Sequence, residues 1–276
     1  MQYLKKVFDF YIQSSIHVAV AVYALVRMTY HMFLIPQDLY MEGFAFFGTI
    51  FGYNFVKYES LFRLKKVIRK QLQAILALSI LSLLLSTYCF FKLQWDTQWV
   101  AVVFFGLTFL YTVPVFSNKQ NIRNWKGVKI YIVAFCWAGV TTLLPLVNSE
   151  TAITTDFFLK FGQRFLLVII LILVFEIIDS KNDDPSLMTV PQKIGVHNTK
   201  ILGVLLLIPF FFLEFLRIHI DQDQLWINLI LVVVTALFTL CATPDRSKYY
   251  TSFWVESIPI FWLGMVVFIE PIKNLF

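Results

Sequence analysis

Four carboxylates stand at the end of a long apolar run, in the sequence Glu-Ile-Ile-Asp-Ser-Lys-Asn-Asp-Asp over residues 176–184. Glu176, Asp179 and Asp183 are three and four residues apart, so a helix would place them on one face. Carboxylates this close repel one another unless a cation lies among them. Mg²⁺ takes carboxylate and water oxygens and is commonly bound together with substrate phosphates. The spacing therefore predicts a site for Mg²⁺ and a phosphorylated ligand at a membrane boundary, where clustered charges are costly.

The composition is that of a membrane protein. Hydrophobic residues make up 59% of the 276 residues and charged residues only 14%, against roughly 25% charged residues in soluble domains. Apolar stretches near the ~20 residues that span a bilayer recur along the chain. We count nine, at about 15–35, 42–56, 72–91, 99–116, 128–147, 161–179, 201–220, 225–242 and 253–270. We expect an all-α fold, a polytopic membrane helix bundle of about nine transmembrane helices, forming one domain over residues 1–276.

The basic residues predict how the bundle is oriented. Most of the 23 Lys and Arg fall in the N-terminal segment and in alternate connections, near 57–70, 119–129, 181–200 and 246–248. By the positive-inside rule the N-terminus is cytoplasmic and the C-terminus outside. We expect an integral membrane protein of a bacterial inner (plasma) membrane. Basic residues spread over such loops also meet anionic lipid, which favours membrane lipid as a partner and argues against nucleic acid.

A second polar segment follows the stretch at 99–116. It begins Tyr-Thr-Val-Pro over 111–114 and continues Ser-Asn-Lys over 117–119. Tyr111 offers a neutral donor and Lys119 a cation, a combination that suits an anion with several oxygens. A turn whose cations only set the topology is the alternative, and this loop by itself does not separate the two.

One further pair of charges lies inside an apolar stretch. Glu214 and Arg217 are three residues apart in the stretch at 201–220. Helical residues at this spacing are neighbours on the helix surface, so we expect the two side chains to pair.

The acidic run and the sequence behind it resemble the second aspartate-rich motif of the UbiA superfamily of intramembrane prenyltransferases. That motif has Asp-x-x-x-Asp, followed by a Thr-x-Pro segment that closes on Gly before the next span. The matching residues here are Asp179, Asp183, Thr189, Pro191 and Gly195. The segment from Tyr111 to Pro114, with Lys119, is similar to the family's fourth span and following loop. The resemblance covers roughly residues 42–200 and is looser elsewhere.

The resemblance implies a reaction and a set of site residues. An isoprenyl diphosphate would bind through Mg²⁺, diphosphate would leave, and the allylic carbocation would alkylate a lipophilic acceptor, for example an aromatic or quinone precursor. Carried onto this sequence, the catalytic residues are Asp179 and Asp183, and the Mg²⁺ ligands are Asp179, Asp183 and Glu176. The diphosphate-binding residues implied in the same way are Asn54, Lys57, Tyr111 and Lys119.

The chain departs from the family at its first motif, Asn-Asp-x-x-Asp. This sequence has Asn54-Phe-Val-Lys57-Tyr58, which keeps the Asn and lacks every Asp. Lys57 is a candidate substitute that would contact phosphate directly. The missing acids leave open a non-catalytic UbiA-like membrane protein that binds a prenyl lipid or a partner. A transporter that couples cations to carboxylates ranks lower, because transporter sites usually lie near the bilayer midplane.

Overall fold

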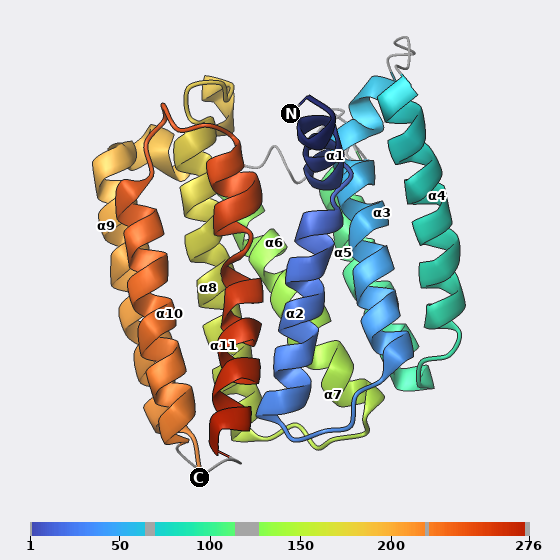
Figure 1. The fold of residues 1–276 in the computed structure, drawn as a ribbon, viewed down its shortest axis with the longest axis vertical. Coiled ribbons are helices and arrows are strands. Elements are labelled where there is room, and N and C mark those ends of the chain that lie inside the picture. Colours follow the sequence, from blue (N-terminus) through green and yellow to red (C-terminus); the bar gives the residue numbers. More distant parts are fainter. Residues whose placement is uncertain (1, 64–69, 114–126, 219–220, 274–276) are drawn as a thin grey trace.

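The computed structural model describes residues 2–63, 70–113, 127–218 and 221–273 as a bundle of long helices (Figure 1). The helices are α1 (Gln2–Gln13), α2 (Ile16–Met32), α3 (Leu39–Arg63), α4 (Lys70–Phe90), α5 (Trp95–Thr112), α6 (Lys129–Ala138), α7 (Leu144–Asn148), α8 (Thr155–Asp179), α9 (Val190–Phe212), α10 (Gln222–Cys241) and α11 (Ile258–Lys273). Shorter turns are η2 (Gly139–Leu143) and η5 (Tyr250–Val255), which are π-helical, and η3 (Pro185–Leu187) and η4 (Leu213–Leu216), which are 3₁₀. The predicted all-α bundle is confirmed.

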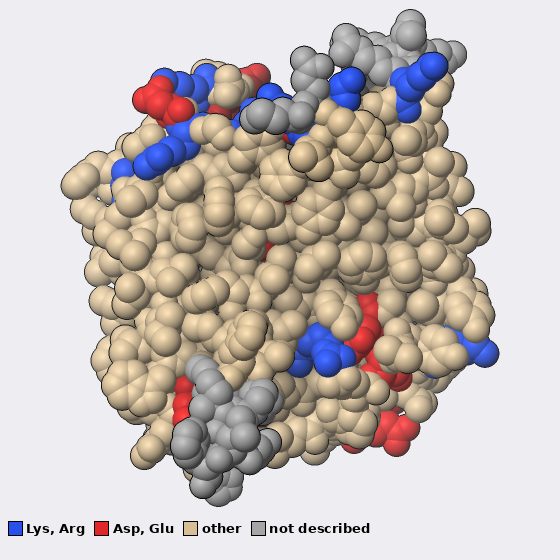
Figure 2. Space-filling view, in the orientation of Figure 1, with Lys and Arg blue, Asp and Glu red and all other residues tan. Residues whose placement is uncertain are grey.

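Within the described residues, six helical segments are long and apolar enough to cross a membrane, or seven if the bent pair α1–α2 is one span. They account for the predicted apolar stretches except those near 42–56 and 99–116. These two form α3 and α5, helices of 25 and 18 residues that lie alongside the others in the bundle (Figure 1). Figure 2 shows a broad apolar band with charged residues mainly toward the two ends, as expected for a membrane protein.

The centre of the bundle is formed by α8 and α2. In α8, 67% of the most apolar segment is buried, compared with 28–33% in α4, α9 and α10. One buried apolar cluster includes Leu25 of α2, Leu167 of α8 and Trp262 of α11. A second cluster joins α2 to α3, α5 and α7. Because α2 contributes to both clusters, it connects the two halves of the bundle.

A bend separates α1 from α2. The two helices meet at 55°, and Ser15 between them has a left-handed φ of 62°. Ser14 and Ser15 are both buried. The bend turns α1 away from the direction of α2, and α1 lies at the upper end of the bundle between α3 and the segment that leads into α11 (Figure 1).

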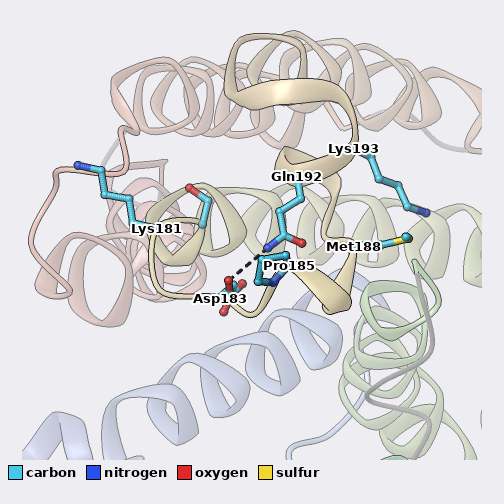
Figure 3. A pocket seen from close by; sticks show the side chains of 7 residues that line it. Lys181, Asp183, Pro185, Met188, Gln192 and Lys193 are labelled. Atoms are coloured by element: carbon cyan, nitrogen blue, oxygen red, sulfur yellow. Dashed lines mark hydrogen bonds between the residues drawn. The ribbon is translucent and has the colours of Figure 1, made fainter.

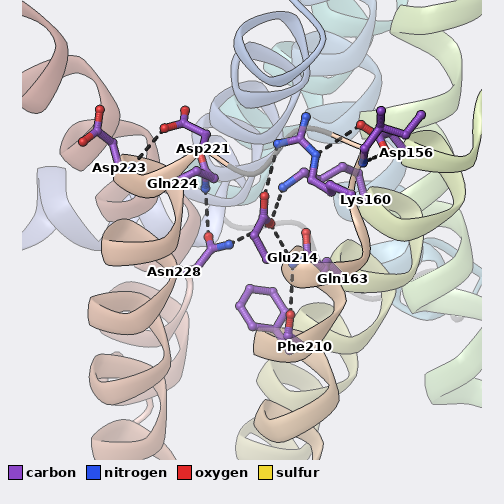
Figure 4. A network of polar contacts seen from close by, with 11 residues as sticks. Asp156, Lys160, Gln163, Phe210, Glu214, Asp221, Asp223, Gln224 and Asn228 are labelled. Atoms are coloured by element: carbon purple, nitrogen blue, oxygen red, sulfur yellow. Dashed lines mark hydrogen bonds and ion pairs between the residues drawn. The ribbon is translucent and has the colours of Figure 1, made fainter.

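A buried polar network lies at the other end of the bundle, where α8 begins and α9 ends (Figure 4). Glu214 is fully buried, and its Oε2 accepts hydrogen bonds from Lys160 Nζ (2.5 Å), Gln163 Nε2 (3.0 Å) and Asn228 Nδ2 (2.9 Å). Its Oε1 pairs with Arg217 Nη1 at 3.1 Å, which confirms the predicted pair. The network ties α8, η4 and α10 together and leaves the carboxylate of Glu214 fully partnered.

Candidate functional site

The helix α8 ends at Asp179, and the chain then makes one further turn. The backbone carbonyl of Asp179 accepts hydrogen bonds from the backbone N–H groups of Asn182 (2.8 Å) and Asp183 (2.9 Å). This turn keeps Asp183 close enough for the two carboxylates to repel each other. Among the described residues, none donates a hydrogen bond to either carboxylate. Both are therefore available to a cation.

An open pocket of about 610 Å³ surrounds Asp183 (Figure 3). The Gln192 amide donates to the backbone carbonyls of Asp183 (3.5 Å) and Asp184 (3.3 Å), and Lys181 extends away from the pocket and pairs with Asp245. The lining residues are Ser180, Lys181, Asp183, Pro185, Met188, Gln192 and Lys193. They come from the connection between α8 and α9 and from the first turn of α9, so this pocket does not by itself bring the predicted α3 and α5 residues to Asp183.

Glu176 is buried and has partners for both carboxylate oxygens. Its Oε1 lies 2.8 Å from Lys129 Nζ, and its Oε2 accepts a hydrogen bond from the backbone N–H of Val190 at 2.9 Å. The side chain thus joins the end of α8 to the starts of α6 and α9. In this arrangement Glu176 has a structural role, and a metal role would require it to give up one of these partners.

The Thr-x-Pro segment predicted as part of the motif forms the start of α9. Thr189 is the N-cap, and its backbone N–H donates to Gln192 Oε1 at 2.9 Å. Pro191 lies in the first turn, where its missing N–H costs nothing. Gly195 has φ 81° and ψ 158°, a conformation nearly restricted to glycine, and it breaks α9 there. The motif therefore shapes the connection that holds Asp183.

Asn54 of α3 is buried and uses both ends of its amide. Its Oδ1 accepts from Ser15 Oγ at 2.8 Å, and its Nδ2 donates to the Ser14 carbonyl (3.0 Å) and to Ser79 Oγ (2.9 Å). These contacts fasten the α1–α2 bend to α3 and α4. Asn54, which was predicted to bind diphosphate, therefore has its amide oxygen and nitrogen hydrogen-bonded to other residues of the protein.

Lys57 lies one turn beyond Asn54, near the end of α3. Its Nζ donates to the backbone carbonyl of Gln13 at 3.2 Å and lies 5.5 Å from the ring centroid of Tyr58. The Tyr58 hydroxyl donates to the same carbonyl at 2.9 Å. Lys57 is exposed, so it can exchange this single neutral contact for a phosphate oxygen.

Two charged residues outside the predicted set connect the α3 and α8 ends. Lys248, in the connection before η5, lies within electrostatic range of both Asp179 and Lys57. Glu256, just after η5, lies within electrostatic range of Lys57. The cluster Lys57, Asp179, Lys248 and Glu256 therefore draws on three separate parts of the bundle. This cluster combines two lysines with two carboxylates at the end of the bundle where α8 ends.

Aromatic groups lie next to this charged cluster. The Tyr53 hydroxyl of α3 accepts a hydrogen bond from Trp137 Nε1 of α6 at 2.6 Å. Tyr53 is within electrostatic range of both Glu256 and Tyr111. Tyr111, a predicted diphosphate ligand, is partly buried near the end of α5. Tyr53 and Glu256 thus form a chain of electrostatic neighbours from Tyr111 to Lys57. The other predicted ligand of this loop, Lys119, lies outside the described residues.

Sequence reasoning missed Glu256 and Lys248. Glu256 could have been found, because an acidic residue within an apolar stretch such as 253–270 is a functional-site candidate on its own. Lys248 has no such signal, since it is one of many basic residues in a topology-setting loop. Only the fold brings it within electrostatic range of both Asp179 and Lys57.

The described residues contain no group of three or more His, Cys, Asp or Glu side chains arranged to hold a metal ion. Asp179 and Asp183 remain as a pair of neighbouring carboxylates that accept no hydrogen bond from the described residues, with Lys248 and Lys129 acting on Asp179 only at longer range. Mg²⁺ is usually bound by one or two carboxylates together with substrate phosphates and water. The two residues therefore fit Mg²⁺ that arrives with a diphosphate, and they do not form an all-protein metal cage.

No protein-family model matches the chain, and no curated protein sequence matches it. Two solved structures share its fold. A UbiA homologue from Aeropyrum pernix K1 is 14% identical, with a TM-score of 0.63, covering 94% of this chain and 97% of that one. A digeranylgeranylglyceryl phosphate synthase is 15% identical, with a TM-score of 0.56 and 97% coverage of both chains. The chain therefore has a UbiA-like fold over nearly its full length, as the sequence motifs predicted.

Proposed function

We propose that this protein is a UbiA-like intramembrane prenyltransferase, which transfers an isoprenyl group from an isoprenyl diphosphate to a lipophilic acceptor. The observation that carries the proposal is the pair Asp179 and Asp183. Both carboxylates lack partners among the described residues, at the end of the central helix of a UbiA-like fold. A carboxylate pair that no described cation contacts directly, at a membrane boundary, favours a ligand that brings positive charge.

Asp179 and Asp183 would hold Mg²⁺, and bound Mg²⁺ would neutralise charge on the departing diphosphate. Lys248 lies within electrostatic range of both Asp179 and Lys57 and would add a direct cationic contact to the phosphate oxygens. Lys57 would exchange the carbonyl of Gln13 for a phosphate oxygen. Lys57 puts a cation in the segment where the family's first motif has acids, which suits direct contact with the anion on the α3 side.

The chemistry would begin when the bond between the allylic carbon and the diphosphate oxygen breaks. The electron pair leaves with the diphosphate, and an allylic cation forms. Tyr53 accepts a hydrogen bond from Trp137 and lies within electrostatic range of Glu256, and the aromatic rings of this pair would stabilise the cation. The acceptor then forms a bond to the allylic carbon and loses a proton.

The test uses the full chain in lipid nanodiscs with geranylgeranyl diphosphate, Mg²⁺ and a panel of phenols, naphthols and lipid alcohols. Product is followed by mass spectrometry. We expect transfer by the wild type and a loss of at least 100-fold in Asp179→Asn and in Asp183→Asn. Asp184→Asn is the matched control in the same connection and should stay within threefold of wild type. Full activity in the Asp179 and Asp183 variants would reject the proposal.

A second function is favoured by the structural use of Asn54 and by the lack of acids in the segment that follows it. A non-catalytic relative would bind a prenyl lipid or a partner and release no diphosphate. The same experiment separates the two, because such a protein would bind geranylgeranyl diphosphate or geranylgeraniol equally well with and without Mg²⁺ and would yield no product.

A further inference from the structure

The first helix, α1, carries an apolar surface that the bundle leaves uncovered. The side chains of Tyr3, Leu4 and Val7 are 78%, 73% and 50% exposed. Val7 is three residues from Leu4 and four from Tyr3, so the three side chains share one face of the helix. Single exposed apolar residues are common on proteins, whereas several large ones together on one face indicate a surface that contacts a membrane or a partner.

The basic residues of α1 indicate what this face contacts. Lys5 and Lys6 are both exposed and stand among the three apolar residues in the sequence. At 3.6 residues per turn, Lys6 lies beside Tyr3 on one side of the face, and Lys5 lies beyond Leu4 on the other side. Helices with one apolar face and lysines on the polar face lie in the interface plane of a bilayer. Lysines near a bilayer surface are attracted to the phosphates of anionic lipids.

The packing of α1 places it at the level of a membrane interface. The ring centroid of Phe8 lies 5.1 Å from that of Phe253 in η5, and the centroid of Phe253 lies 5.2 Å from that of Trp254. Trp254 is 56% exposed. Tryptophan is enriched in membrane proteins at the level where the hydrocarbon meets the head groups. Because α1 packs beside such a tryptophan, at the end of the bundle where α8 ends (Figure 1), its bare face meets the head groups as well.

Fixed contacts hold α1 in this place. The helix meets α2 at 55°, so it leaves the direction of the span that follows it. Phe8 also packs on Tyr249, with 5.8 Å between ring centroids, and the Tyr249 hydroxyl donates a hydrogen bond to Asp9. On the α3 side, the Tyr58 hydroxyl donates to the backbone carbonyl of Gln13 at 2.9 Å. The bundle therefore covers the second half of α1 and presents the first half outward.

A second copy of the chain suits this face less well than lipid does. A contact between two copies related by a two-fold axis joins the same patch of both chains. Lys5 and Lys6 of one copy would then meet the same lysines of the other copy. An anionic lipid surface covers the apolar residues equally well and neutralises the lysines.

We propose that α1 lies on an anionic lipid surface, with Tyr3, Leu4 and Val7 inserted at the boundary between head groups and acyl chains and with Lys5 and Lys6 on lipid phosphates. This contact does not depend on the proposed transfer reaction, so each stands or falls without the other.

Spin labels measure where α1 lies. The full chain, with Cys89, Cys136 and Cys241 changed to alanine, carries one label at Leu4→Cys in nanodiscs of seven parts phosphatidylcholine to three parts phosphatidylglycerol. Oxygen dissolves in lipid and a neutral nickel chelate dissolves in water, so the ratio of their collision rates with the label reports its depth. Labels at the exposed positions Leu205→Cys in α9 and Gln222→Cys at the start of α10 are the lipid and water references.

We expect the ratio at position 4 to be at least fivefold higher than the ratio at position 222. A ratio equal to that at position 222 overturns the inference, because α1 then projects into water. A label shielded from both reagents also overturns it, because protein then covers α1, as it would in a dimer.

The lysine contacts are tested with the same label. In nanodiscs of phosphatidylcholine alone, we expect the ratio at position 4 to be at least twofold lower than with phosphatidylglycerol. Lys5→Gln together with Lys6→Gln should abolish this difference. Lys92→Gln, at an exposed position in the connection after α4, is the control and should keep it. A difference that persists without Lys5 and Lys6 overturns the lysine contacts.

Proteolysis tests the surface in the chain that keeps its own cysteines. Trypsin cuts after lysine, so cleavage after Lys5 and Lys6 reports access to α1. Cleavage after Lys181, which is exposed in the connection after α8, is the internal reference. We expect the rate after Lys5 and Lys6, relative to the rate after Lys181, to be at least fivefold lower in nanodiscs with phosphatidylglycerol than in those without it. Equal relative rates overturn the inference, whether or not the cysteine-free chain folds.

Discussion

Glu176 Oε2 accepts a hydrogen bond from the backbone N–H of Val190 at 2.9 Å. This contact joins the last turn of the central helix α8 to the first turn of α9, across the connection that carries Asp183. The carboxylate therefore fixes the shape of the loop in which the proposed metal ligands lie. It satisfies a helix N-terminal N–H that would otherwise lack an intrahelical partner.

We expect Glu176→Ala to destabilise the protein by roughly 3 kcal/mol, because the partly buried Lys129 loses the carboxylate that it contacts and Val190 loses its acceptor. The measurement is thermal or denaturant unfolding of the purified chain in detergent. The double variant with Glu176→Leu and Lys129→Met should recover most of the loss, since no unpaired charge remains. A stable Glu176→Ala protein with weakened Mg²⁺ dependence would instead support Glu176 as a metal ligand.

Asn54→Asp restores an acid to the region of the altered first motif, yet we expect it to lower stability by about 1–3 kcal/mol. The new carboxylate loses the two donor bonds of the amide and places negative charge beside the Ser14 carbonyl. Unfolding in detergent provides the measurement. Gain of Mg²⁺-dependent diphosphate binding without loss of stability would contradict the structural role found for Asn54.

Lys57→Ala and Lys248→Ala should each weaken binding of geranylgeranyl diphosphate about tenfold, equivalent to about 1.4 kcal/mol. Lys248 acts directly on Asp179, and Lys57 lies within electrostatic range of Lys248, so each change removes a cation from this cluster. Lys92→Ala, at an exposed position in the connection after α4, is the matched control and should bind as wild type does. Calorimetric titration in the presence of Mg²⁺ measures the effect, and unchanged affinity in both lysine variants would remove them from the diphosphate site.

Gly195→Ala should cost about 1–3 kcal/mol of stability, because its φ of 81° disfavours any side chain. A methyl group at this position would meet no atom within 4 Å, so the cost is conformational and not a clash. Gly264→Ala is the control, since it also meets nothing within 4 Å and has no positive φ. Equal stability of the two alanine variants would show that the break in α9 is not required.

The buried network around Glu214 lies at the end of the bundle away from Asp179, and we expect its disruption to lower the free energy of unfolding. Glu214→Ala leaves Lys160 buried without its partner, at 2% exposure, and should destabilise the protein by roughly 3–5 kcal/mol. Glu214→Gln should cost less, because it keeps hydrogen-bonding capacity. Unfolding measurements that show no difference between the two variants would contradict this role, and neither should alter diphosphate affinity.

The bundle was predictable because a membrane makes apolar stretches of about 20 residues an unambiguous signal. The stretches became helices near the predicted positions, and Glu214 pairs with Arg217 as their spacing indicated. The second motif was also predictable, since Thr189, Pro191 and Gly195 are each needed by local backbone geometry. Local rules of this kind operate along the chain and need no knowledge of distant contacts.

The roles of Glu176 and Asn54 could not be read from the sequence, because residue type shows that a side chain can bind a ligand but not whether a neighbour has already engaged it. Lys129 and Val190 engage Glu176, and Ser14, Ser15 and Ser79 engage Asn54.

The sequence by itself determined a helical membrane bundle, a shaped connection after α8, and a pair of acids at its start. Tertiary structure alone decided which charged groups share a region. Lys57, Asp179 and the segment that holds Lys248 and Glu256 are far apart along the chain. Only the packing of α3 and α11 against α2, and of α8 against η5, brings them within electrostatic range. The physical reason is that helix formation depends on neighbours three and four residues away, whereas a site depends on which helix faces meet.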